Sequence, residues 1–144
     1  MDGSIKPLTI EDYDEIIRVW GDAGLRYRPK GRDSREKMRK EMQRDVCMFF
    51  GYYFDDRLIG VSIANYDGRR AWINRLAVDP DYRGQGIAGQ LIAACEEFLT
   101  DLGALVISAL IEDINEPSIA AFHKAGYTCL DSIKYFSKRG SWED

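Results

Sequence analysis

Histidine and cysteine are scarce in this sequence, which has one histidine, His123, and three cysteines, Cys47, Cys95 and Cys129. The cysteines are odd in number, lie far apart and stand among apolar residues, so we expect buried free thiols in a reducing compartment. No group of histidines and cysteines has the spacing of metal ligands. The sequence therefore predicts no metal site and no disulfide framework.

A basic excess and long hydrophobic runs are also lacking. The 144-residue chain has a formal net charge of −4, which gives no indication of nucleic-acid binding. Its apolar runs are too short to span a bilayer, and the N-terminal residues MDGSIKPLTIEDYDE do not have the order of a signal peptide. We therefore expect a single domain over residues 1–144 that is cytoplasmic and binds neither nucleic acid nor a membrane.

The hydrophobic pattern changes along the chain from strand–turn–strand to strand–helix–strand. The first half predicts an antiparallel meander of strands, and the second half predicts a β-α-β unit, so the fold class is α/β (α+β) with a mixed sheet. The apolar run 104–111 is typical of a strand that is covered on both sides. The expected order is β-α-α-β-β-β-α-β-α-β, with strands at 4–10, 46–54, 57–66, 71–78, 104–111 and 127–138 and helices at 10–24, 34–45, 86–102 and 115–126.

A glycine-rich segment, YRGQGIAGQL, opens the helix at 86–102. Its glycines have the G-x-G-x-x-G spacing of a dinucleotide-binding loop, in which backbone N–H groups at a helix start approach a pyrophosphate. Two features disfavour a nicotinamide or flavin dinucleotide. The residues DPDYR separate the loop from the preceding strand, and the chain after it is too short for a doubly wound sheet.

The longer stretch LAVDPDYRGQGIAGQLI resembles the acetyl-CoA-binding motif of the GNAT superfamily of N-acetyltransferases, Arg/Gln-x-x-Gly-x-Gly/Ala. The later stretch NEPSIAAFHKAGY resembles the family's second motif, a helix that begins with asparagine and ends in glycine and an aromatic residue. The order of strands and helices matches over nearly the whole chain, most closely the small single-domain bacterial or archaeal members. The resemblance implies a GNAT-like sheet and transfer of an acetyl group from coenzyme A to an amine.

The resemblance also implies where acetyl-CoA, the co-substrate, binds. Free N–H groups of residues 84–89 are expected to hold the diphosphate, with charge from Arg83 at the rim. The strand 74–78 is expected to bulge and to part from the strand 105–111, which exposes backbone groups to the pantetheine arm. The N–H of Leu76 is the candidate that polarises the thioester carbonyl. The full set of cofactor residues is Leu76, Ala77, Val78, Arg83, Gly84, Gln85, Gly86, Ile87, Ala88, Gly89, Asn115 and Phe122, where Asn115 can equally serve as a helix N-cap.

The usual acid and base of the family are absent from their positions. Asn74 stands where many members have a glutamate that deprotonates the amine, and Phe122 stands where many have a tyrosine that protonates the thiolate. Three explanations stay open: catalysis by proximity and carbonyl polarisation, a substitute base such as Glu112 acting through water, or a non-catalytic acyl-CoA-binding or regulatory module. His123, next to Phe122, is more simply a surface or capping residue, and Tyr66 and Tyr135 are expected to be packing residues.

The acceptor is not identified by the sequence, which leaves small amines, peptide N-termini and protein lysines open. The loop after the first helix contains Arg26, Arg28, Lys30 and Arg32, which suits either a solvated loop or attraction of an acceptor with a carboxylate or phosphate. Aromatic residues near the C-terminus, Tyr135, Phe136 and Trp142, would permit a homodimer.

Overall fold

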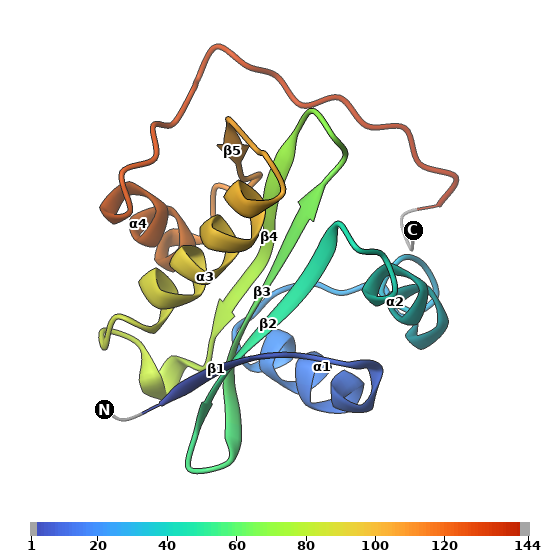
Figure 1. The fold of residues 1–144 in the computed structure, drawn as a ribbon, viewed down its shortest axis with the longest axis vertical. Helices are drawn as coiled ribbons and strands as arrows, with labels where there is room; N and C mark the ends of the chain where they lie inside the picture. The colour runs from blue at the N-terminus through green and yellow to red at the C-terminus, as the bar shows by residue number, and fades with distance from the viewer. Residues whose placement is uncertain (1–2, 142–144) are drawn as a thin grey trace.

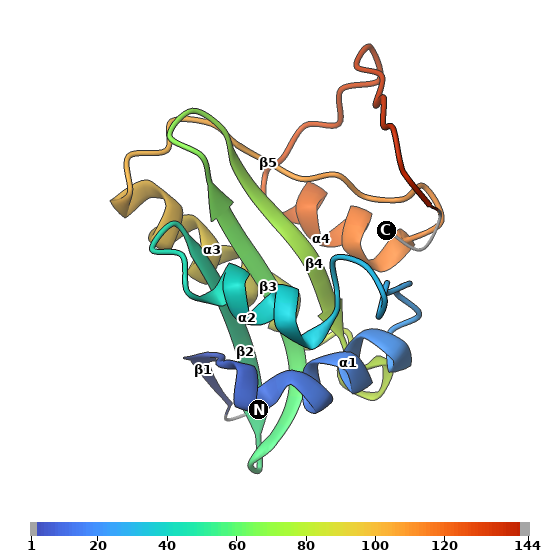
Figure 2. The same cartoon turned by 90° about the vertical axis from the view of Figure 1, so that its right-hand side faces the viewer.

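The computed structural model describes residues 3–141 as a five-stranded sheet with helices on both faces (Figures 1 and 2). The strands follow the order β1-β2-β3-β4-β5; neighbours are antiparallel except β4 and β5, which are parallel. This confirms the expected meander followed by a β-α-β unit. The strand bounds are β1 Ser4–Pro7, β2 Cys47–Phe54, β3 Arg57–Tyr66, β4 Ala71–Val78 and β5 Ile107–Ser108.

The four α-helices start and end close to where their caps predict. Ser34 accepts the N–H of Lys37 at the start of α2, and Asn115 does the same for Ser118 in α4. Gly126, at φ 95°, follows the end of α4 in the left-handed region that glycine favours. The helix bounds are α1 Tyr13–Asp22, α2 Arg35–Met42, α3 Ile87–Asp101 and α4 Glu116–Lys124.

Two hydrophobic cores lie on opposite faces of the sheet. Helix α3 buries Leu91, Cys95 and Leu99 against β3 and β4, and α4 adds Phe122 to the same core. Helices α1 and α2 bury Trp20 and Met38, among others, on the other face. Figure 1 shows α3 and α4 on one side of the strands and α1 and α2 on the other. The sheet is therefore packed on both faces, and β4 contacts both α1 and α3.

The predicted last strand, 127–138, is wrong, because this segment forms no strand. Tyr127 is still attached to the body: its hydroxyl donates to Glu96 Oε2 at 2.9 Å and its ring meets Phe122 edge-on. Beyond it the chain runs along the outside without a partner strand (Figure 1), and β-forming residues do not make a strand without ladder hydrogen bonds. Phe136 is consequently 88% exposed.

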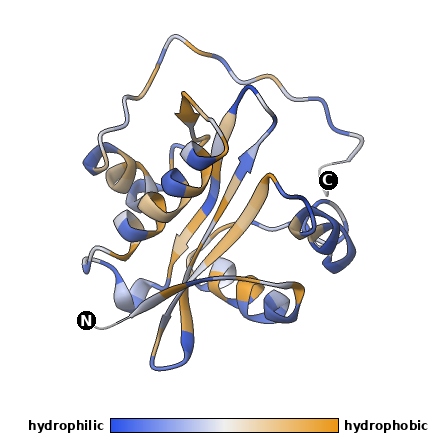
Figure 3. Cartoon of the chain, viewed as in Figure 1, coloured by the Kyte–Doolittle hydropathy of each residue, from blue (hydrophilic) through white to orange (hydrophobic). Residues whose placement is uncertain are grey.

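Other expectations for the strand 104–111, for Cys129 and for Tyr135 are also wrong. The predicted strand 104–111 shrinks to β5, and it is not covered on both sides, since Leu105 is 97% exposed. Cys129 is exposed rather than buried, while Cys47 and Cys95 are buried as predicted. Tyr135 is exposed rather than packed. Figure 3 shows hydrophobic residues scattered along this outer segment; Trp142 lies outside the described residues.

The described residues contain no helix that is long and apolar enough to cross a membrane. Within the same range, no group of three or more histidine, cysteine, aspartate or glutamate residues is arranged to hold a metal ion.

Candidate active site

Strand β4 bulges at Arg75 and Leu76, as the resemblance to the family implies. Val61 pairs with Ala77 and Ile63 with Asn74, so two residues of β4 lie opposite the single residue Ser62 of β3. Arg75 takes a φ of 55°, a left-handed conformation that is rare for a residue with a side chain. The bulge turns the backbone at Leu76 away from the regular ladder.

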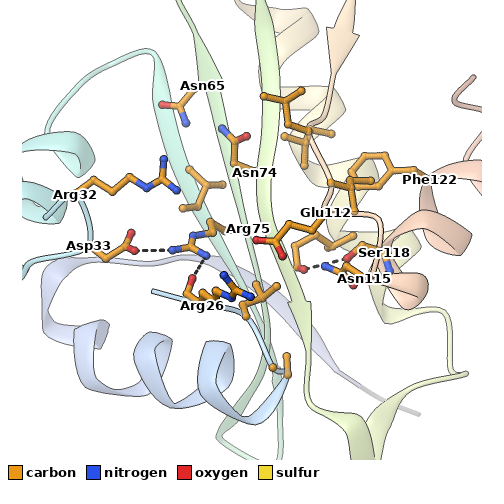
Figure 4. A pocket seen from close by; sticks show the side chains of 18 of the residues that line it. Arg26, Arg32, Asp33, Asn65, Asn74, Arg75, Glu112, Asn115, Ser118 and Phe122 are labelled. Atoms are coloured by element: carbon orange, nitrogen blue, oxygen red, sulfur yellow. Dashed lines mark hydrogen bonds and ion pairs between the residues drawn. The ribbon is translucent and has the colours of Figure 1, made fainter. Parts of the chain in front are cut away.

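Three contacts hold the side chain of Arg75, and Figure 4 shows those with Asp33 and Arg26. This side chain forms an ion pair with Asp33 at 2.5 Å, donates to the carbonyl oxygen of Arg26, and lies over the ring of Trp20 at 4.6 Å from the centroid. Burial lowers the pKa of the Arg75 guanidinium, and the Asp33 carboxylate opposes that shift. These contacts bind the loop between α1 and α2 to the bulge and fix an otherwise unfavourable backbone conformation.

Strands β4 and β5 part immediately after they meet. Their pairing is confined to Ala71 with Ile107 and Trp72 with Ser108, so the rest of β4 has no partner on this side. The Ser118 hydroxyl, on α4, donates to the carbonyl oxygen of Leu76 at 3.3 Å. The carbonyl of Leu76 therefore faces α4 and the gap beside β4.

The glycine loop before α3 leaves its N–H groups free. Among residues 3–141, none of the N–H groups of 84–89 donates a hydrogen bond, and the first helical bond runs from Gln90 N to Gly86 O. Gly84 and Gly86 have φ values of 78° and 79°, which require glycine, and a Cβ there or at Gly89 would meet open space. The first turn of α3 contains no acidic residue, so the positive end of its dipole is not neutralised locally.

The side chains of this loop divide into inward and outward groups. Ile87 is buried in the core beneath α3 and Ala88 is half-buried, so these residues can offer only their backbone and small size to a ligand. Gln85 is exposed. The Arg83 guanidinium donates to the carbonyl oxygen of Ala23 at 3.4 Å, which places its charge between the loop and the end of α1.

A cavity of about 830 Å³ lies between the parting strands and the α1–α2 loop. It brings together Leu76, Asn74, Glu112, Asn115 and Phe122 from elements that are far apart in the sequence (Figure 4). Phe122 is 5% exposed and carries no proton to give, and Glu112 is exposed at the cavity wall. Asn115 lines the cavity while its side chain caps α4, so the capping role is confirmed.

The other side chains considered from the sequence are one histidine and two tyrosines. His123 is exposed in the last turn of α4, in agreement with its expected surface or capping role. Tyr66 is partly buried against the core, as predicted. Tyr135 reaches the cavity wall from the C-terminal segment.

Sequence reasoning missed several residues of the cavity. Ser118 and the pair Arg75–Asp33 carry no local signal, because their partners come from distant parts of the chain. Lys37, Glu41 and Arg44 also line the cavity, and only their helical spacing beside the buried Met38 hinted at it. Burial raises the pKa of Glu41; Asp33 adds to this rise, and a hydrogen bond with Asn65 opposes it.

Comparison with known proteins identifies the family. Residues 12–127 match the sequence model of the acetyltransferase (GNAT) family. The chain belongs to this family. An acetyltransferase of Sodalis glossinidius is 30% identical over 90% of this chain and 89% of its own length, and one of Yersinia pseudotuberculosis is 28% identical over 85% and 86%.

Solved structures agree on the fold of this GNAT protein. The crystal structure of PaiA N-acetyltransferase from Thermoplasma acidophilum in complex with coenzyme A has a TM-score of 0.80 at 23% identity and covers 92% of this chain and 94% of its own. AAC(6′)-Iy in complex with a bisubstrate analogue has a TM-score of 0.79 at 18% identity, covering 96% and 99%.

Family membership bears on one of the three explanations that the sequence left open. The protein is an acetyl-CoA-dependent N-acetyltransferase, and the non-catalytic binding module is not favoured. The weaker dinucleotide interpretation of the glycine loop loses its support for the same reason.

Proposed function

We propose that the amine acceptor attacks the acetyl thioester directly in the gap between β4 and β5. The observation that carries this proposal is the combination of a bulge at Arg75 and Leu76 with strands that part after Trp72. The Leu76 N–H would donate to the thioester carbonyl in this gap and to the oxyanion that develops on it. No covalent acyl-enzyme is needed, because the amine is itself the nucleophile.

Coenzyme A would be held in two parts. The free N–H groups of Gly84, Gln85, Gly86, Ile87, Ala88 and Gly89 would bind the diphosphate, with the α3 dipole and the Arg83 charge adding attraction. The pantetheine arm would lie along β4 and pair with the backbone of Leu76, Ala77 and Val78 like an added strand. Asn115 and Phe122 would contact the arm from α4, on the opposite side of the gap.

Acid–base catalysis would proceed without the glutamate and the tyrosine that many family members have at the positions of Asn74 and Phe122. Alignment of amine and thioester can account for about 7–11 kcal/mol of a barrier. An acceptor α-amine with a pKa near ~8 is already partly neutral, and a thiol with a pKa near ~8.5 can leave without a proton donor. Glu112, exposed at the cavity wall, is our candidate base and would take the amine's proton through a water molecule.

Setting and assembly remain expectations from the sequence. We propose a cytoplasmic enzyme that acts on a primary amine and has no membrane partner, and its free cysteines suit a reducing compartment. We propose no nucleic-acid partner, on the basis of the net charge of −4. A homodimer through the C-terminal segment is proposed from the exposure of Tyr135 and Phe136.

The proposed mechanism is tested by following thiol release from acetyl-CoA with a panel of amines. The Cys129→Ser variant is used so that the exposed thiol does not react with the detection reagent. We expect amine-dependent release that reaches a saturating rate with acetyl-CoA and shows intersecting lines when both substrates are varied. Parallel lines, or an isolated acetyl-enzyme, would contradict direct attack.

A further inference from the structure

On the basis of the proposed acetyl transfer, we propose that the acceptor is a small amine that also carries a carboxylate or phosphate. The geometry assigns its anionic group to a cationic wall formed by Arg26, Arg32, Lys37 and Arg44. Its amine would then lie on the opposite side of the cavity, toward Glu112 and the thioester.

The charge of the cavity differs in sign from that of the whole protein. Its lining contains six cationic and three anionic side chains, although the chain as a whole has a net charge of −4. One of the three anions, Asp33, is already engaged by Arg75. A second, Glu41, lies on α2 and interacts electrostatically with Arg44 and Arg32. Clefts with one dominant sign of charge concentrate ligands of the opposite sign.

The four side chains of the cationic wall form no close ion pair within the described part of the fold. Within residues 3–141, Arg26, Arg32, Lys37 and Arg44 form no ion pair within 4.0 Å, whereas Arg18 and Arg75 on nearby elements do. All four line the cavity, from the α1–α2 loop, from α2 and from the turn that follows it. Of the basic loop that the sequence singled out, Arg26 and Arg32 line the cavity, but Arg28 and Lys30 do not.

The cationic wall and Glu112 lie on opposite sides of the cavity. Figure 4 shows Arg32 extending from the side of the α1–α2 loop and Glu112 from the side of the chain after β5, with Asn74 on the strand between them. An acceptor with an amine at one end and an anion at the other matches this polarity. A polyamine would place further positive charge against the arginines, and such like-charge contacts are unfavourable.

The test compares matched amines that differ only in the anion. The compounds are glycine, β-alanine and γ-aminobutyrate, each beside its amide, and O-phosphoethanolamine beside ethanolamine, with spermidine as the polycation. Binding to the protein saturated with coenzyme A is measured by calorimetry, and kcat/KM is measured separately and expressed per neutral amine. We expect at least one anionic compound to bind and react about tenfold better than its neutral partner, and this preference should fall with added salt.

Charge-reversed variants locate the preference. Arg32→Glu should reduce it about tenfold, which corresponds to about 1.4 kcal/mol, with no change in affinity for coenzyme A. The matched control is Arg39→Glu, because Arg39 is exposed on α2 and does not line the cavity. It should leave the preference unchanged. A phosphate acceptor is distinguished from a carboxylate acceptor by which pair of compounds shows the larger preference for its anionic member.

The outcomes separate this inference from the proposed function. Equal binding within every pair, a preference for the neutral compounds or spermidine, or equal effects of the two charge reversals would overturn the anionic acceptor. Preferential binding of an anionic amine at the cationic wall, without any acetylation, would support the inference. It would count against the proposed acetyl transfer to that amine.

Discussion

Replacement of Arg75 by methionine tests whether the bulge depends on its side-chain contacts. The substitution removes the guanidinium that pairs with Asp33 at 2.5 Å, and leaves a carboxylate whose side chain is only 8% exposed. Asp33 would retain the N–H of Arg28 at 2.6 Å but no cation within ion-pair distance. Breaking a buried ion pair by removal of one partner costs about 3–5 kcal/mol.

The same change should affect catalysis through the backbone. A residue with a Cβ in the left-handed region costs about 1–2 kcal/mol, and in the wild type this is offset by the contacts of Arg75 with Asp33, Arg26 and Trp20. Without them we expect the bulge to relax and the adjacent Leu76 N–H to move. Displacement of a catalytic group by about 1 Å can lower the reaction rate about 10²-fold. The kcat should therefore fall by up to that factor, with little change in KM for acetyl-CoA.

The assay combines urea unfolding with steady-state kinetics. Lys40→Met serves as the control, since its pair with Glu36 is exposed and should contribute less than about 1 kcal/mol. If Arg75→Met is too unstable to assay, the double variant with Asp33→Asn removes both buried charges and should regain part of the stability but not of kcat. If Arg75→Met loses less than about 1 kcal/mol of unfolding free energy, or if kcat is unchanged in both variants, the bulge does not depend on the contacts of Arg75.

Three further predictions concern individual side chains. Glu112→Gln should lower kcat about 10²-fold, and an unaltered kcat would exclude it as the base. Folding raises the pKa of Glu41, so its contribution to stability is present below the ordinary value of 4.5 and is lost as the pH rises. The Glu41→Gln variant should therefore have a larger free energy of unfolding than the wild type near about pH 7.5, and no larger one near about pH 4. Only Cys129 should react with a thiol reagent in the native protein, since burial raises the pKa of Cys47 and of Cys95 to about 12; fast labelling of either would contradict the packing of the cores.

Features that depend on neighbouring residues were accessible from the sequence. The Ser34 and Asn115 caps, the glycines before α3 and the apolar spacing of that helix each report on a few consecutive residues. The bulge and the parting of β4 from β5 came from the resemblance to the family, because nothing in the local pattern of 71–78 distinguishes it from a regular strand.

Features that depend on distant partners were not accessible. The segment 127–138 reads as a strand in the sequence but forms none, because strand propensity depends on pairing with distant residues. Asp33 reads as a loop residue, but it is buried because Arg75, far along the chain, neutralises it. Lys37 lies on α2 and Arg44 in the turn after it, both in a polar stretch of the sequence, and only the fold brings them to the cavity.

The central claim is that the free amides of residues 84–89 bind the diphosphate of coenzyme A. Calorimetric titration with acetyl-CoA and with acetyl-pantetheine, which lacks the diphosphate, measures their contribution directly. The test variant is Gly86→Val and the matched control is Gly103→Val, since Gly103 follows the other end of α3, also has a positive φ of 104° and also faces open space. The account predicts that Gly86→Val alone abolishes the advantage of acetyl-CoA over acetyl-pantetheine. Retention of that advantage in a folded Gly86→Val protein, or its equal loss in both variants, would contradict it.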